Sequence, residues 1–137
     1  MGLDDLAAKA EAGSTVAQTV LGISLLESRD YPGALRWLTA AAENGASRAM
    51  VHLGRMFEAG FEVAVDLSRA RGLYERAAER GEFLACVLLA RLLASGQGGN
   101  LDQIGALRWY REALSHSGVE DCPELEEARA FVAARAE

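Results

Sequence analysis

The sequence predicts an all-α fold, an α-solenoid of about three helix-turn-helix repeats with an N-terminal half-repeat and a C-terminal capping helix. Three observations predict it. Apolar residues recur at the three-and-four spacing of one helix face, and a glycine follows most of the predicted helices. The third observation is a period, because Asp30, Asp66 and Asp102 stand 36 residues apart before matching apolar patterns. Self-similarity at a fixed period of about 20 to 50 residues is typical of a solenoid.

The chain has 137 residues, of which half are hydrophobic, 25% are charged and 2 are prolines. This composition favours one compact helical domain over residues 1–137. Within it we expect the following divisions: a half-repeat over 1–13, units over 14–45, 46–81 and 82–118, and a cap over 119–137.

The first predicted helix covers Leu3 to Ala12, and Gly13 ends it. Ser14 or Thr15 can then cap the first helix of the first unit. Asp30 caps the second helix, whose Pro32 lies in the first turn, where a missing N–H costs nothing. Helix, turn, helix and a closing glycine make up one unit.

The second unit repeats this pattern without omission, with Asp66 as the cap and Gly81 at the end. The third unit follows it from Ala85 to Gly118. A last amphipathic helix is predicted from Pro123 to about Ala134, as a stack needs to cover its terminal face.

Two tryptophans match in register across the repeats. Trp37 and Trp109 occupy the same place in the first and third units, and Leu73 fills it in the second. We expect all three to pack between helices rather than to bind a ligand.

The formal net charge of −6 gives no general field for phosphates, so we expect no nucleic-acid partner. No apolar run approaches the ~18 to 20 residues of a membrane helix, and the first residues lack the basic and apolar regions of a signal peptide. We therefore expect a cytoplasmic protein without membrane insertion, or a periplasmic or secreted one if a signal peptide has been removed.

No cofactor, metal site or catalytic residue is predicted. The motifs of zinc proteases, serine hydrolases and phosphate-binding loops are missing, and only His52 and His116 could act as imidazole bases. Cys86 and Cys122 stand 36 residues apart, so they lie on successive packed units about 8 to 10 Å apart or more. A disulfide tolerates Cα separations of only about 4.4 to 6.8 Å, so we expect no bridge.

The pattern AxxxLGxxF, a loop with Gly60, then DxxxAxxLYxxAAxxG resembles the Sel-one-like repeat, a relative of the tetratricopeptide repeat, over about residues 14–118. The first unit departs from it: Leu25 to Asp30 spans 5 positions, where Phe57 to Asp66 spans 9, so its loop is shorter. The resemblance implies a right-handed superhelix whose first helices line a concave face. Members of this family commonly act as scaffolds or adaptors for proteins and peptides.

The same resemblance implies which residues would face a partner in the concave groove. Transferred relative to Leu21, Leu53 and Leu89, they are Thr19, Ile23 and Glu27 in the first unit, Arg48, Val51, Arg55 and Glu58 in the second, and Leu84, Val87, Arg91 and Ser95 in the third.

Arg55 and Arg91 take the same place in consecutive units, beside the apolar Val51 and Val87. Two guanidinium groups above an apolar strip could hold a carboxylate of a peptide. The alternative is that both arginines pair only with Glu58 and with solvent.

We expect a non-catalytic module that binds a protein or peptide on its concave face, and we expect charge reversal at Arg55 and Arg91 to weaken binding without lowering the melting temperature. The alternative is a structural protein that forms a homodimer through the Phe61 to Val65 loop or through the last helix with Phe131. An enzyme is a residual third possibility, because no nucleophile has a base beside it.

Overall fold

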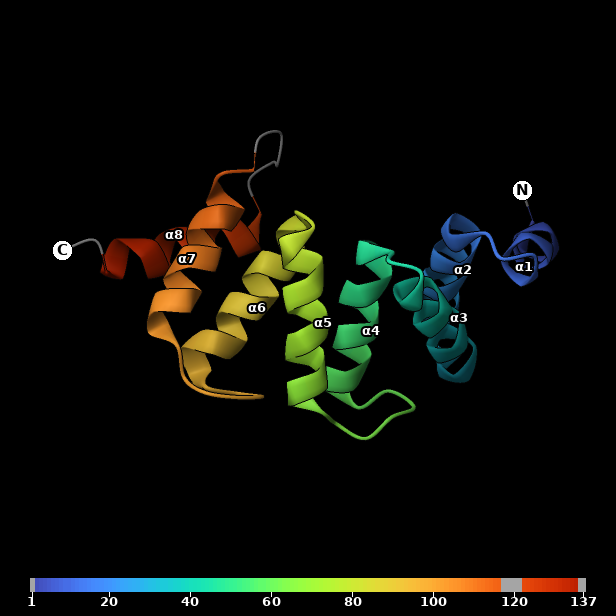
Figure 1. Cartoon of the computed structure of the whole chain (residues 1–137), viewed down its shortest axis with the longest axis horizontal. Coiled ribbons are helices and arrows are strands. Elements are labelled where there is room, and N and C mark those ends of the chain that lie inside the picture. Colours follow the sequence, from blue (N-terminus) through green and yellow to red (C-terminus); the bar gives the residue numbers. More distant parts are fainter. Residues whose placement is uncertain (1, 117–121, 136–137) are drawn as a thin grey trace.

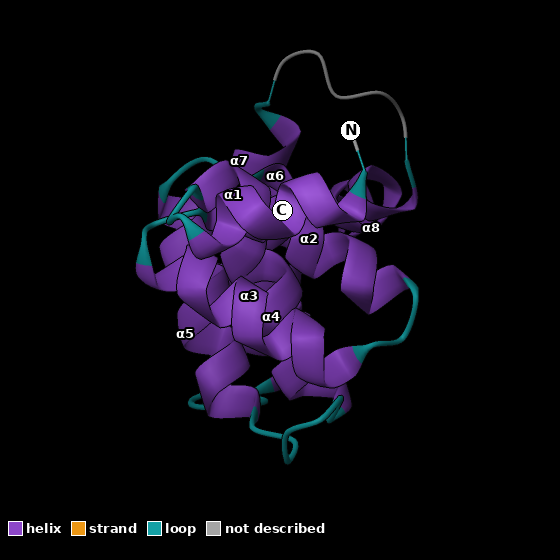
Figure 2. Cartoon of the chain, turned by 90° about the vertical axis from the view of Figure 1, so that its right-hand side faces the viewer, coloured by secondary structure: helices purple, strands orange, loops and turns teal. Residues whose placement is uncertain are grey.

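The computed structural model describes residues 2–116 and 122–135, and in this part of the chain it contains eight α-helices and no strand. The helices are α1 (Leu3–Glu11), α2 (Thr15–Glu27), α3 (Tyr31–Glu43), α4 (Ser47–Ala59), α5 (Leu67–Glu79), α6 (Phe83–Ser95), α7 (Gln103–Leu114) and α8 (Pro123–Ala134). The described segments between the helices are loops and turns (Figure 2). The predicted all-α architecture is confirmed.

Each helix contacts the next one along the chain, from α1 on α2 to α7 on α8. The helices therefore follow one another along the long axis of the molecule, with the two termini at opposite ends (Figure 1). We call α2, α4 and α6 the first helices of the three units and α3, α5 and α7 the second helices. Among the described residues, no helix combines the length and the apolar character needed to cross a membrane.

The predicted N-caps form as the sequence indicates. The side chains of Asp30, Asp66 and Asp102 each accept a hydrogen bond from the backbone N–H three residues later, at 3.2, 3.0 and 2.7 Å. Ser14, not Thr15, caps α2, since its hydroxyl accepts from the N–H of Ala17. Each such bond satisfies one of the backbone donors that a helix start leaves free.

Glycines end the units where the backbone turns into the left-handed region. Gly45 and Gly81 follow α3 and α5 with φ of 90° and 88°, a conformation that side chains with a Cβ rarely adopt. Gly118, the predicted end of the third unit, lies outside the described residues, and α7 ends at Leu114.

The core is built over small side chains. Ala41, Ala77 and Ala113, one in each unit, are all 0% exposed. One continuous cluster runs from α3 to α8, and a smaller one around Trp37 joins α1 to α2 and α3. Trp109 is half-buried against the large cluster, so both tryptophans pack between helices as expected.

Helix α8 covers the C-terminal end of the stack. It contacts α7 and α6, and its Leu125 and Ala128 are buried. Leu125 follows Leu89 by 36 residues, so α8 continues the register of the first helices. This position places α8 beside the predicted groove as well as over the core.

Candidate functional site on the first-helix face

The eleven residues predicted to face a partner lie on α2, α4 and α6, but only some reach the surface. Six are exposed: Glu27, Arg48, Arg55, Glu58, Arg91 and Ser95. Ile23 and Leu84 are half-buried. The remaining three, Thr19, Val51 and Val87, are buried.

The apolar strip expected between the two arginines is not at the surface. Val51 and Val87 are 3% and 0% exposed, belong to the core cluster and do not line the hollow between the arginines, so they offer no floor to a ligand there. The reason is that the first helices are covered on several sides, and α6 is buried almost all round from Ala85 to Ala90. The hydroxyl of Thr19 is occupied within α2, where it donates to the carbonyl of Thr15 at 2.9 Å.

A hollow of about 400 Å³ nevertheless lies where the two arginines meet. Its lining residues are Arg55, Glu58, Ala59, Phe61, Leu88 and Arg91. Phe61 is 39% exposed and stacks on Tyr31 with ring centroids 4.6 Å apart, which fixes the α4–α5 loop at the rim. Sequence reasoning did not assign Phe61 and Leu88 to this groove, because neither follows from the helical positions of a tetratricopeptide unit.

Arg91 already has a carboxylate partner. Its Nε donates to both carboxylate oxygens of Glu127 on α8 at 2.8 Å, and its Nη2 lies 2.6 Å from Oε1. The hydroxyl of Tyr110 donates to the same carboxylate at 2.6 Å. Such forked, charge-assisted pairs are among the stronger polar contacts in proteins.

These contacts change the titration of the pair. Burial acts to raise the pKa of Glu127, but the hydrogen bonds from Arg91 and Tyr110 outweigh it, and the pKa lies below its ordinary value. The hydrogen bond from Arg91 to Glu127 likewise raises the pKa of Arg91. Glu127 therefore stays charged and remains paired with Arg91. The repeat register offered a signal for this pair, because Glu127 stands 36 residues after Arg91.

Arg55 differs from Arg91 in having no such partner. Its guanidinium is exposed and makes no hydrogen bond or ion pair with the described residues. The expected partner, Glu58, instead accepts a hydrogen bond of 2.6 Å from the hydroxyl of Tyr74. Burial and this hydrogen bond raise the pKa of Tyr74, so its hydroxyl stays protonated and keeps donating.

Charged groups of both signs lie near Arg55. Burial lowers the pKa of His52, one helical turn away, and the nearby charges of Arg55 and Arg48 lower it further, against a smaller opposing effect of Glu27. The imidazole is therefore neutral at pH 7. Thus Arg55 and Arg48 are the cations that this face offers to a ligand.

A second hollow, of about 390 Å³, lies toward the N-terminal end of the same face. It is lined by Thr15, Val16, Thr19, Val20, Ala46, Ser47, Arg48 and Glu82. Val16 is 75% exposed, and the Ser47 hydroxyl donates to Glu82 at 3.1 Å. The face therefore carries exposed valines at one end and, in the middle, a hollow lined by Arg55, Arg91 and the carboxylate of Glu58.

Nothing in the described residues groups three or more potential metal ligands. Cys86 and Cys122 are free thiols, and Cys86 is 0% exposed, with burial raising its pKa to about 11. A buried thiol that stays protonated is a poor nucleophile and a poor metal ligand. The arrangement on this face suits noncovalent binding of a chain segment.

Several solved structures resemble the chain. The crystal structure of a Sel1 repeat protein from Oxalobacter formigenes is 33% identical, with a TM-score of 0.80, over 96% of this chain and 97% of that one. The c5321 protein, a protective antigen present in uropathogenic Escherichia coli strains that displays an SLR fold, is 25% identical with a TM-score of 0.82; all of this chain matches 34% of it. Cysteine-rich protein B of Helicobacter pylori shares the fold, with 21% identity and a TM-score of 0.72 over 96% of this chain.

Among curated proteins, none matches the chain. The model of the Sel1 repeat matches residues 17–45, 47–82 and 84–117, close to the three predicted units. Sel1 repeats generally mediate protein interactions and typically form a non-enzymatic scaffold. Three consecutive matches over most of the sequence, on an all-helical stack, show that the chain belongs to the Sel1 repeat family.

Proposed function

We propose that the chain is a non-catalytic adaptor that binds an extended segment of a partner protein on its first-helix face. In this proposal Arg55 fixes a carboxylate of the segment, either an acidic side chain or a C-terminus. An adjoining apolar side chain packs on Phe61 and Leu88, which line the same hollow.

The observation that carries the proposal is the unequal state of the two arginines. Arg91 is neutralised by Glu127, whereas Arg55 lies in the same hollow without a partner. A charge-assisted hydrogen bond contributes about 1.5–3 kcal/mol, part of which is offset by the rotamer entropy that the arginine side chain loses on pairing. Among the two arginines of this hollow, Arg55 is thus the one expected to contribute more to the binding free energy of an acidic ligand.

The test is selection of random displayed peptides on the wild-type chain, followed by binding measurements on the selected peptides. We expect them to contain an acidic residue or to need a free C-terminus, and Arg55→Glu to raise the Kd about tenfold or more. Arg111→Glu makes the same charge change on an exposed residue of α7 and serves as the matched control. Equal Kd values for Arg55→Glu and Arg111→Glu would refute the role of Arg55.

Arg91 is not a suitable second variant, which corrects the expectation drawn from the sequence. Reversing its charge would break the contact with Glu127 and loosen α8, so the melting temperature would change together with any binding. Arg55→Glu breaks no contact among the described residues and should leave the melting temperature unchanged.

Self-association is the second candidate function, and one observation favours it. Val65 and Leu101, at matching positions before the caps of α5 and α7, are 59% and 62% exposed, and Ile104 is 83% exposed. Sedimentation velocity at rising concentration tests it. A dimer that Ile104→Glu disperses would support this edge as an interface, and a monomer throughout would exclude it.

A further inference from the structure

The second helices of the three units differ at two positions that lie outside the first-helix face. In the first and third units the same two positions hold an arginine and a tryptophan, Arg36–Trp37 and Arg108–Trp109. Each guanidinium lies over the neighbouring indole, at 4.2 and 4.9 Å from the ring centroid. In the middle unit the two positions are Gly72 and Leu73.

This exchange leaves open space on α5. A Cβ added at Gly72 would meet nothing within 4 Å, so no neighbouring atom requires a glycine there. Glycine inside a helix costs about 0.5–1 kcal/mol relative to alanine. The chain thus carries a local cost at Gly72 without a packing reason for it.

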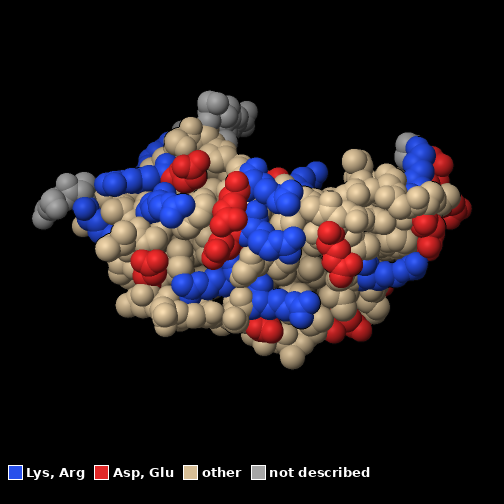
Figure 3. Space-filling view, in the orientation of Figure 1, with Lys and Arg blue, Asp and Glu red and all other residues tan. Residues whose placement is uncertain are grey.

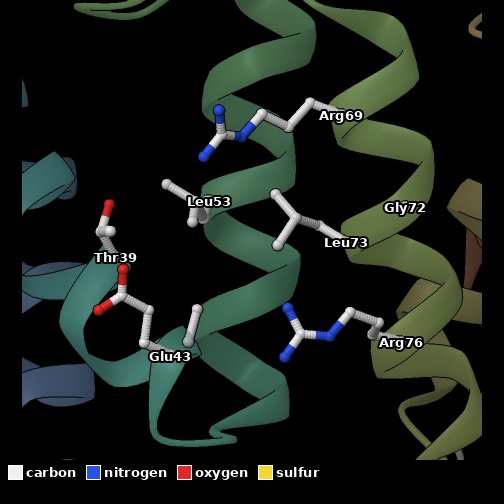
Figure 4. Close-up of a pocket in the computed structure, with 8 residues that line it drawn as sticks. Thr39, Glu43, Leu53, Arg69, Gly72, Leu73 and Arg76 are labelled. Atoms are coloured by element: carbon white, nitrogen blue, oxygen red, sulfur yellow. The ribbon is translucent and has the colours of Figure 1, made fainter.

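A hollow of about 310 Å³ lies beside Gly72 and Leu73, and we call this hollow the α3–α5 notch. It is lined by Thr39, Ala42, Glu43, Leu53, Arg69, Gly72, Leu73 and Arg76. Figure 4 shows Leu53 and Leu73 between the two helices, with Arg69 and Arg76 extending from α5 on either side of them. The volume is at the lower end of ligand pockets, about 300–1,000 Å³, and suits one large side chain.

The two arginines are as specific to the middle unit as the missing tryptophan. The positions of Arg69 and Arg76 hold Gly33 and Ala40 in the first unit and Gly105 and Glu112 in the third. Arg69 lies over the ring of Phe57 at 4.8 Å, and neither arginine has an ion pair among the described residues. Basic side chains gather around α4 and α5 in the middle of the face shown in Figure 3.

We propose that the α3–α5 notch is a second binding site, which takes an aromatic side chain from an acidic segment of a partner protein. The ring would enter the space that corresponds to the one taken by the buried Trp37 in the first unit. In the third unit, hollows of about 270 Å³ remain beside Trp109, and neither of them has an arginine at the positions of Arg69 and Arg76. Carboxylates on either side of that ring would pair with Arg69 and Arg76. Leu53 and Leu73 form the apolar floor of the notch. An aromatic ring can pack on these side chains, whereas a phosphate would make no apolar contact with them and would lose hydration there.

The notch is formed chiefly by second helices, while the Arg55 hollow is formed by α4, α6 and the α4–α5 loop. The inference therefore goes beyond the proposed function and stands or fails separately from it.

The experiment is an NMR titration of the full chain with blocked tripeptides, observed on backbone amides. The probe has tryptophan between two glutamates; the controls have tryptophan between two lysines and alanine between two glutamates. We expect saturable shifts around Leu53, Gly72 and Leu73 with the probe and at least about tenfold weaker binding of both controls. Equal shifts with the lysine peptide or with inorganic phosphate would overturn the proposal, as would shifts confined to the surroundings of Arg55.

The matched variant copies the neighbouring units into the middle one. Gly72→Arg/Leu73→Trp places the chain's own arginine and indole in the notch, and we expect the probe to lose its saturable shifts there while the rest of the spectrum stays folded. Arg69→Gln/Arg76→Gln leaves the space open and removes only the charges, with an expected Kd about tenfold higher. Probe binding unchanged in either folded variant contradicts the proposal.

Discussion

The middle unit, residues 46–81, and the third unit, residues 82–118, share one backbone plan but differ in how their surface groups are satisfied. In the third unit Arg91 is paired with Glu127, and Trp109 is covered by Arg108. In the middle unit Arg55 is unpaired, and Gly72 and Leu73 leave the notch open. The third unit thus pairs its groove arginine with α8 and helps to hold the stack together, whereas the middle unit leaves the guanidinium of Arg55 without a partner among the described residues.

The middle and third units also differ in the hydrogen-bond partner of the buried tyrosine on their second helices. Tyr74 and Tyr110 are equivalent, but Tyr74 donates to Glu58 within its unit and Tyr110 donates to Glu127 on the following helix. Gly54 lies against the ring of Tyr74, and the position equivalent to Gly54 in the third unit is Ala90. A Cβ at Gly54 would lie 2.5 Å from Cε1 of Tyr74, so the glycine makes room for this ring position.

Gly54→Ala is the prediction with the largest effect. The methyl group has to displace the buried ring of Tyr74, and overpacking of this kind typically costs about 1–3 kcal/mol. We expect a lower free energy of unfolding by that amount, measured by urea denaturation. The matched control is Ala90→Gly, which should cost only about 1 kcal/mol from helix propensity; a Gly54→Ala protein as stable as the wild type would show that the two units accommodate their tyrosines alike.

The next prediction tests whether the Arg91–Glu127 pair of the third unit holds α8 in place. Arg91→Glu puts two carboxylates together, so we expect a loss of about 1 kcal/mol, because the pair is partly exposed. The measurement is the melting temperature together with hydrogen exchange of the α8 amides. Arg91→Glu/Glu127→Arg should restore protection of α8. Exchange in α8 that does not respond to Arg91→Glu would mean that the pair does not hold this helix.

The smallest expected effect is a pH dependence confined to the same pair. Because the folded pKa of Glu127 lies below its ordinary value of 4.5, its contribution to stability is complete above about pH 4.5 and is lost as the pH falls through the folded pKa. Glu127→Gln should therefore narrow the stability difference between pH 6 and pH 3. Parallel stability curves for the variant and the wild type would contradict this assignment.

Much of the fold follows from residue spacing alone. The caps at Asp30, Asp66 and Asp102 and the burial of the alanine stripe depend on contacts within a unit, which a period of 36 residues reports directly. The site is less accessible to such reasoning. Register placed Arg55 and Arg91 correctly on one face, but it does not say which neighbouring helix covers a position.

Two residues illustrate that limit. Val51 appeared to be a groove residue from its position on α4, yet adjacent helices bury it to 3% exposure. Glu127 lies on the capping helix and neutralises Arg91, although the two are separated along the chain. The notch shows a different limit. The sequence shows that Gly72 and Leu73 replace the arginine and tryptophan of the neighbouring units, but only the structure shows the hollow beside them.

The most direct test of binding through the middle unit is hydrogen exchange on the wild-type chain, with and without a peptide selected on its first-helix face. The account predicts that the peptide protects amides of α4 and of the α4–α5 loop, next to Arg55 and Phe61, more than those of α7 and α8. Protection confined to α7 and α8, or no greater in α4 and the α4–α5 loop than in α7 and α8, would contradict it.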